Sequence, residues 1–151
     1  MSIHDRLRAH GITLPPAAAP VASYQPVVVD GHTAYVSGQL PFIDGKLVTG
    51  KLGEDVALDR GIAAARACGM MILSQLEAAG LIERVAHMVK LGGFVASIPD
   101  FFDQPKVING ASDLMVEVFG DPGKHARSAV GVPVLPLNAA VEVDAIVALK
   151  A

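Results

Sequence analysis

RSAVGVPVLPLNAAVEVDAIVAL, residues 127–149, is the stretch that decides the expected fold. Its two ends, roughly residues 127–134 and 140–149, are rich in valine and predict two strands, with a turn at 136–138 between them. In the second strand, Val141 and Val143 alternate with Glu142 and Asp144, which is typical of a strand that buries one face. If these two strands pair as a hairpin, Arg127 and Glu142 lie near opposite ends of it, and another subunit or a loop must bring them together.

Upstream of this stretch the sequence predicts two helices and a strand. Residues 85–96 are apolar on both faces, which indicates a central strand or one at an interface. The helix that follows begins near Pro105 and ends at Gly120. A longer helix covers about 55–79, because its apolar and small residues, Ala65 and Gly69 among them, recur at spacings of three and four. We expect those two small residues to let this helix lie close against a sheet.

The first third of the chain predicts two hairpins after a short helix. Asp-Gly pairs tolerate the positive φ that tight hairpin turns require. The hairpins comprise residues 24–29 with 32–37, around Asp30-Gly31, and residues 40–43 with 46–49, around Asp44-Gly45. Residues 2–10 predict a short helix, and the proline-rich segment 14–20 (LPPAAAP) predicts an irregular connection.

The resulting order, β-β-β-β-α-β-α-β-β, predicts an α+β fold in one domain spanning residues 1–151, with 1–14 as a short N-terminal extension. It gives one sheet of about six strands with two helices on one face. No helix remains to cover the opposite face, although it carries many apolar positions. We therefore expect sheet faces from several subunits to meet.

Composition excludes several classes of function. The net charge is −3 and the pI about 5.9, so neither nucleic acid nor a membrane surface is an expected partner. Apolar residues make up 52% of the chain, yet prolines interrupt its longest uncharged stretch, so we expect no membrane span. Cys68, the single cysteine, cannot form an intrachain disulfide, and we predict a reducing, cytoplasmic location.

Few residues in the chain are typical of catalysis. The sequence has no clustered metal ligands, phosphate-binding glycine loop or GxSxG motif, and its five histidines are scattered. Cys68 lies next to the buried stripe of the long helix, which favours a packing role. Arg127 and Glu142 bound a run without charged residues. They are either ordinary surface charges at strand edges or parts of a binding site. Tyr24, Ser37 with the flexible Gly38, and Asn109 are equally open to a structural or a ligand-binding role.

In order along the chain, Tyr24, YVSGQLP (35–41), VKLGGFV (89–95), Asn109, HARSAV (125–130) and VEVDAIV (141–147) resemble the YjgF/RidA family of reactive-intermediate deaminases. The resemblance extends from about residue 17 to 150 and fits a longer, divergent branch. It implies a chorismate-mutase-like α+β fold and a homotrimer with clefts between subunits.

The resemblance also implies hydrolysis of 2-aminoacrylate-type enamines and imines, which are small molecules, to 2-oxo acids and ammonia. Arg127 falls on the family's carboxylate-binding arginine and Glu142 on its acidic residue, which activates water. Tyr24, Ser37 and Asn109 fall on further substrate-binding positions, to which Gly38 and Ser128 are added as neighbours. No metal and no cofactor are expected, because an imine is already electrophilic.

Other functions remain open at this point. The same cleft could bind a 2-oxo acid as a sensor without turnover, and a purely structural trimer is favoured only if Arg127 is paired internally. RNA cleavage, sometimes ascribed to relatives, fits poorly with the acidic pI. The chain also departs from many family members in having Ala129 where they carry a cysteine, which argues against a thiol role.

Overall fold

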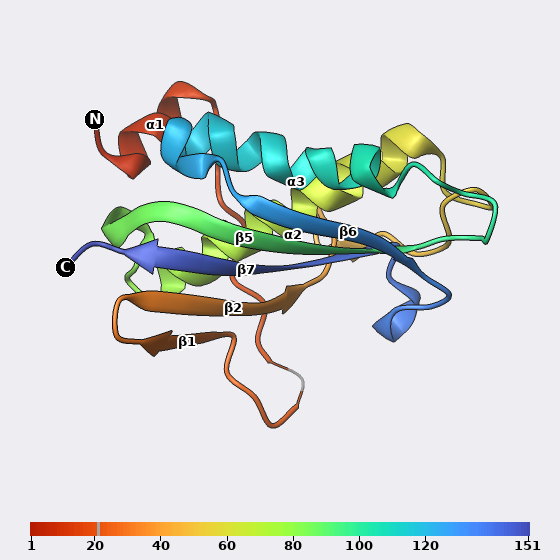
Figure 1. The fold of residues 1–151 in the computed structure, drawn as a ribbon, viewed down its shortest axis with the longest axis horizontal. Coiled ribbons are helices and arrows are strands. Elements are labelled where there is room, and N and C mark those ends of the chain that lie inside the picture. The colour runs from red at the N-terminus through yellow and green to blue at the C-terminus, as the bar shows by residue number, and fades with distance from the viewer. Residues whose placement is uncertain (21) are drawn as a thin grey trace.

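A computed structural model describes residues 1–20 and 22–151. The described residues form three α-helices, the first of them short, and seven strands in the predicted order; Figure 1 shows how these elements are arranged. The elements are α1 (Ile3–Ala9), β1 (Val27–Asp30), β2 (Thr33–Gln39), β3 (Phe42–Ile43), β4 (Lys46–Leu47), α2 (Leu58–Ala78), β5 (Val85–Ala96), α3 (Gln104–Phe119), β6 (Ala126–Val132) and β7 (Val141–Leu149), with single 3-10 turns at Ile82–Arg84, Asp121–Gly123 and Pro136–Asn138. The chain therefore has the α+β fold that the sequence predicts.

The main sheet has five strands in the order β1-β2-β7-β5-β6, and β3 and β4 form a separate two-stranded sheet. The second predicted hairpin thus forms but does not join the main sheet. The last two strands do not pair as a hairpin either, since β5 lies between them, antiparallel to β7 and parallel to β6. The apolar β5 thus pairs the backbone N–H and C=O groups of both of its edges. The connection from β6 to β7 is long enough to pass across it.

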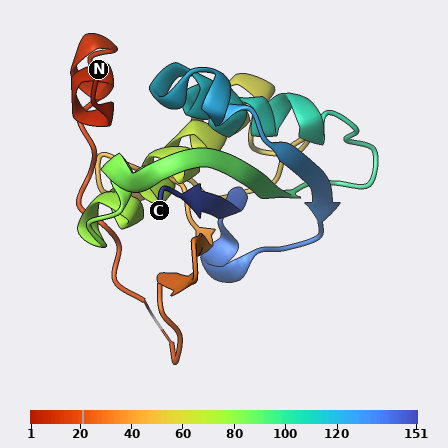
Figure 2. The same ribbon diagram turned by 60° about the vertical axis from the view of Figure 1, so that its left-hand side comes forward.

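Both long helices cover the same face of the main sheet (Figures 1 and 2). Their buried residues form one core with the inward positions of the strands. Gly69 of α2 faces α3 rather than the sheet, because the atoms nearest to a Cβ placed there belong to Leu114 and Ala111. The expectation that Gly69 packs on a sheet is therefore wrong, and the absent side chain instead brings the two helices close together.

The opposite face of the sheet carries no helix. Along β7 the odd-numbered residues are buried and the even-numbered ones, including Glu142 and Asp144, are half-buried on this open face. Val28, Tyr35 and Val130 are each 45–50% exposed, although all three are apolar or aromatic. Such a concentration of exposed apolar side chains is typical of a surface that contacts another protein.

The first helix packs against α3 and the turn that follows α2, and residues 15–20 lie against α2. Ser2 caps α1, accepting a hydrogen bond from the Asp5 amide at 3.0 Å. His4 Nε2 lies 2.7 Å from Glu77 Oε2, and its Nδ1 contacts the Glu83 carboxylate. Hydrogen bonds to these two glutamates raise the pKa of His4. These contacts attach α1 to the end of α2, and residues 14–20 follow as the irregular segment that the sequence predicts.

Within the described residues, no helix combines the length and apolar character needed to cross a membrane.

Candidate functional site

A bulge in β2 places two of the predicted site residues. Val36 pairs with Ala145 and Gln39 with Val143, so three steps along β2 match two along β7. The extra residue lies in the Ser37-Gly38 pair, where the strand bends. The Ser37 hydroxyl donates to the Gln25 carbonyl at 2.7 Å, which fixes the bulge to the segment before β1. Bulges of this kind redirect side chains and are common beside active sites.

Gly38 leaves room for the Glu142 carboxylate. A Cβ at position 38 would lie 2.3 Å from Glu142 Oε2, well inside contact distance. The carboxylate is half-buried and has no hydrogen-bond partner among the described residues. Burial raises the pKa of Glu142, and the nearby Asp144 carboxylate raises it further. A carboxylate in these surroundings takes up a proton more readily than an ordinary glutamate, as a general base does.

Replacing Gly38 with alanine is expected to lower the activity of this site by about tenfold or more, because the new methyl group displaces the Glu142 carboxylate. The fold should survive, since only the end of one side chain has to move. Steady-state kinetics combined with circular dichroism tests this. Gly31→Ala, where a Cβ meets no atom within 4 Å but the backbone is left-handed (φ 62°), is a control for backbone strain away from the cavity. Full activity in Gly38→Ala would mean that the position of Glu142 is unimportant.

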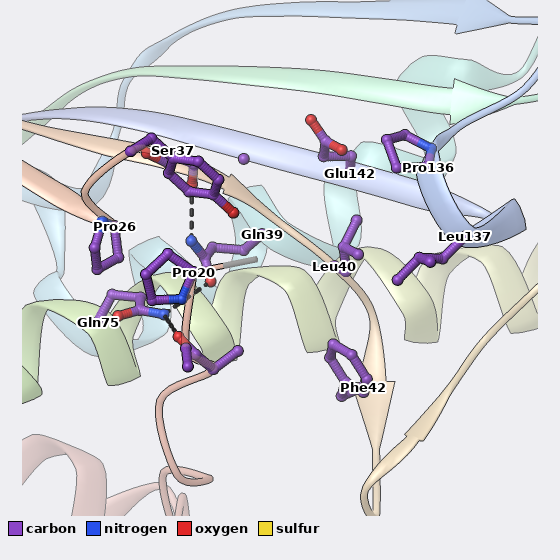
Figure 3. Close-up of a pocket in the computed structure, with 14 residues that line it drawn as sticks. Pro20, Pro26, Ser37, Gln39, Leu40, Phe42, Gln75, Pro136, Leu137 and Glu142 are labelled. Atoms are coloured by element: carbon purple, nitrogen blue, oxygen red, sulfur yellow. Dashed lines mark hydrogen bonds between the residues drawn. The ribbon is translucent and has the colours of Figure 1, made fainter. Parts of the chain in front are cut away.

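Glu142 borders a cavity of about 650 Å³ that is also lined by Tyr24, Ser37 and Gly38. Figure 3 shows these residues with the remainder of the lining. The rest of the wall is apolar or uncharged: Ala18, Ala19, Pro20, Pro26, Gln39, Leu40, Phe42, Gln75, Pro136 and Leu137. Leu137 has a left-handed backbone (φ 59°), an uncommon conformation for leucine that accompanies functional loops. Four of the seven predicted site residues thus meet in one cavity.

Two buried glutamines at this cavity were missed in the sequence analysis. Gln75 Nε2 donates to Gln39 Oε1 at 3.2 Å and to the Ala18 carbonyl at 2.7 Å, and Gln39 Nε2 donates to the Ser37 carbonyl at 2.9 Å (Figure 3). The chain of amides joins α2, the bulge of β2 and the N-terminal segment. Gln39 belongs to the SGQLP motif and could have been predicted as a site residue from it. Nothing in the helical pattern distinguishes Gln75 from other polar residues.

Arg127 lies apart from this cavity, at the edge strand β6. Its Nη1 donates to Asn109 Oδ1 at 2.7 Å and to Ser112 Oγ at 3.2 Å, both on α3. Neither partner is charged, and the ion pairs found in residues 1–20 and 22–151 do not include Arg127. The Nε and Nη2 edge is left for a ligand, and a guanidinium can grip a carboxylate there through two parallel hydrogen bonds. Arg127 is therefore hydrogen-bonded within its own chain, but to uncharged partners.

Ser112 and His125, which the sequence analysis did not single out, support Arg127. His125 Nδ1 lies 2.6 Å from the Gly123 carbonyl oxygen, so in the neutral imidazole Nδ1 carries the proton. Its Nε2 is then an acceptor for the Ser112 hydroxyl at 2.8 Å. The oxygen of Ser112 remains able to accept from Arg127, and the three side chains form a connected set.

Arg127 and Glu142 occupy opposite faces of the sheet in one chain. Arg127 contacts α3 on the helix-covered face, whereas Glu142 points to the open face. Ser128, next to Arg127, also faces the open side and lines a second cavity of about 600 Å³ there. Ser37 and Gly38 border both cavities. Within one chain, the predicted site residues therefore fall into separate groups.

Among the described residues, the cysteine and the possible metal ligands do not form a further reactive or metal-binding site. Cys68 is fully buried, and burial raises the pKa of its thiol, so the predicted packing role is confirmed. Over the described part of the chain, no three histidine, cysteine, aspartate or glutamate side chains are grouped so as to hold a metal ion.

The model of the family described as "YjgF/chorismate mutase-like, putative endoribonuclease" matches residues 4–149. The chain belongs to the YjgF/RidA family. Protein TCP17 of Trypanosoma cruzi is 52% identical over 147 residues, which are 95% of this chain and 92% of that protein. The 2-iminobutanoate/2-iminopropanoate deaminase of Dermatophagoides farinae is 31% identical over 141 residues, covering 92% of this chain and 95% of that enzyme.

Among solved structures, a protein of unknown function from Agrobacterium tumefaciens superposes with a TM-score of 0.90 at 48% identity. The match covers 98% of this chain and 92% of that one. The YjgF/RidA fold thus accounts for nearly the whole chain, and the N-terminal residues are included in it. These matches establish the family membership and the fold of the chain.

Proposed function

We propose that this YjgF/RidA protein hydrolyses reactive enamines and imines derived from amino acids to 2-oxo acids and ammonia. The observation that carries the proposal is the Glu142 carboxylate, half-buried and without a hydrogen-bond partner in the described chain, at a cavity that also contains Ser37 and Tyr24. A relative 31% identical over most of its length is named as a deaminase of 2-imino acids, which supports the same chemistry.

The reaction needs water, a base and a grip on the substrate. An enamine first becomes the imine by gaining a proton on its terminal carbon and losing one from nitrogen. Water then adds to the carbon of the C=N bond, and the C–N bond breaks after the nitrogen has taken up protons. The water oxygen becomes the carbonyl oxygen of the 2-oxo acid, and ammonia leaves. In this proposal Glu142 takes a proton from the attacking water and returns it to the departing nitrogen, while Arg127 binds the substrate carboxylate. No step requires a cofactor.

The two halves of the site are joined in this proposal by a homotrimer. Arg127 of one protomer, with Asn109 beside it, reaches the Glu142 cavity of a neighbour. Two features support this: Arg127 and Glu142 lie on opposite faces of one chain, and the open face carries exposed Val28 and Tyr35. Contact between open faces removes that apolar surface from water, which stabilises the assembly.

The second candidate is a sensor that binds a 2-oxo acid in the same cleft without turnover. The neutral, amide-rich lining around Gln39 and Gln75 favours it, because such groups hold a ligand without reacting. RNA cleavage, which the family description mentions, has less support, since the net charge of −3 repels a phosphate backbone.

The proposal is tested by generating imines in the presence of the protein with an amino-acid oxidase and trapping them with semicarbazide. We expect the protein to compete with trapping for several amino acids, and light scattering to give about three times 15.6 kDa. Binding of 2-oxo acids without any loss of trapped product would favour the sensor. A monomer at micromolar concentration would contradict the site shared between protomers.

A further inference from the structure

The segment Pro15–Pro20 forms one side of the Glu142 cavity. It carries no secondary structure of its own and is attached to α2 by side chains of that helix. Ser74 Oγ donates to the Pro15 carbonyl at 2.7 Å, and Gln75 Nε2 donates to the Ala18 carbonyl at 2.7 Å. The Ala18 amide lies 3.4 Å from Met71 Sδ. Two of these three α2 side chains, Ser74 and Gln75, are buried polar groups whose hydrogen bonds hold the segment in place.

This wall is apolar where it meets the cavity. Ala18, Ala19 and Pro20 line it, and Leu40 and Phe42 contribute to the same lining. In Figure 3, Pro20, Leu40 and Phe42 surround the cavity on the α2 side, away from the carboxylate of Glu142. Of the fourteen lining residues, Glu142 alone is charged. Gln39 and Gln75 also line the α2 side, but their amides hydrogen-bond to each other and to backbone carbonyls. A substrate that places its reacting carbon at Glu142 therefore directs its side chain into mainly apolar surroundings.

The cavity is also larger than the smallest imino acids require. In the isolated chain the cavity measures about 650 Å³, part of which Arg127 of the neighbour would occupy in the proposed trimer, and this is in the range of sites that enclose a whole drug-sized molecule. The imine of alanine would fill only a fraction of it, leaving water against apolar walls. A branched or aromatic side chain would displace that water, and apolar area removed from water stabilises the complex.

We propose that Ala18–Pro20 form the wall that binds the substrate side chain, so that imines with large apolar side chains, such as those of leucine and phenylalanine, are preferred to the imine of alanine. This inference rests on the proposed function, because it assigns the substrate class of the same site.

Ala19→Leu tests the wall, since the added carbons occupy space in the cavity while the exposed backbone there tolerates the change. We expect kcat/KM for the phenylalanine-derived imine to fall about tenfold or more, and that for the alanine-derived imine to change less than about twofold. Ala17→Leu, the same change on the same segment but outside the lining, is the matched control. The proposal would be overturned if Ala19→Leu lowered kcat/KM equally for both imines. It would also be overturned if Ala17→Leu caused the same losses as Ala19→Leu.

Ser74→Ala provides a second variant that leaves the lining untouched. Without the hydrogen bond to Pro15, exchange of the amide hydrogens of residues 17–19, which are the non-proline residues of this segment, should accelerate, and the ratio of the two kcat/KM values should fall toward one. Faster exchange with an unchanged ratio would contradict the proposal that this segment binds the substrate side chain. A wild-type protein without turnover would refute the proposed function alone if it still bound 4-methyl-2-oxopentanoate more tightly than pyruvate. Turnover confined to small imines would refute only the proposed role of Ala18–Pro20. The absence of both turnover and binding would refute this role and the proposed function together.

Discussion

Arg127→Ala is expected to lower kcat/KM for imine hydrolysis by about 30-fold or more while the protein stays folded. The guanidinium is held by Asn109 and Ser112 through Nη1 only, so its other edge is available to the substrate carboxylate. Removing one partner of a charge-assisted pair in a partly buried cleft costs about 2–5 kcal/mol, and about 2 kcal/mol corresponds to a 30-fold loss. The effect should also appear as weaker binding of a 2-oxo acid, which calorimetry measures.

Arg127→Lys should be nearly as poor, because an ammonium group offers no planar pair of donors. Arg60→Ala, at an exposed position on α2, is the control for losing one positive charge. Wild-type turnover in Arg127→Ala would place the carboxylate-binding group elsewhere. Wild-type turnover in Arg127→Lys alone would mean that charge, rather than two-pronged geometry, is what the substrate requires.

Glu142→Gln is expected to reduce turnover by about 100-fold, the usual size of a general-base effect, and to leave binding of a 2-oxo acid intact. Glutamine keeps the shape above Gly38 but cannot accept a proton. Binding should even strengthen slightly, because a negative charge near the ligand is lost. The trapping assay and calorimetry on the same variant distinguish the enzyme from the sensor. Loss of both turnover and binding would instead indicate that Glu142 holds the site together.

The pH profile gives the same carboxylate an independent signature. Because the folded protein raises the pKa of Glu142, this carboxylate becomes protonated at a higher pH than an ordinary glutamate does. The acid limb of the kcat/KM profile should therefore lie above the usual range for this side chain. Asp144→Asn is the matched control: turnover at neutral pH should remain, and the acid limb should move to lower pH because one source of the raised pKa is gone. An unshifted limb would assign it to another group.

Local patterns were sufficient to predict most of the fold. The apolar periodicity of 55–79 and 105–119, the two Asp-Gly turns and the uniformly apolar 85–96 each corresponded to an observed element. Strand order was harder, since it depends on contacts distant in sequence. The insertion of β5 between β6 and β7 follows from β5 having two apolar faces and two edges to satisfy, and no property of residues 127–149 alone determines it.

For the candidate site, the sequence singled out residues whose polarity contrasts with their neighbours. Glu142 and Arg127 interrupt apolar strands, and Ser37-Gly38 ends one, so their pattern was visible. Gln75 and Ser112 are neutral residues within helices, where polar side chains are ordinary, and their roles depend on what packs against them. The placement of Arg127 and Glu142 on opposite faces also required the structure, because residue alternation in one strand does not determine how it faces another.

The strand order has a consequence for how the chain is synthesised. β7 is the last strand in sequence, yet it lies between β2 and β5, so residues 141–149 must leave the ribosome before the main sheet can close. Until then β2 and β5 each have an unpaired edge, and β2 keeps it until more than a hundred further residues have been made. The nascent chain therefore cannot fold stepwise from its N-terminus. α2, which is made before β5 and packs against β2 in the folded chain, can cover part of the apolar surface in the meantime.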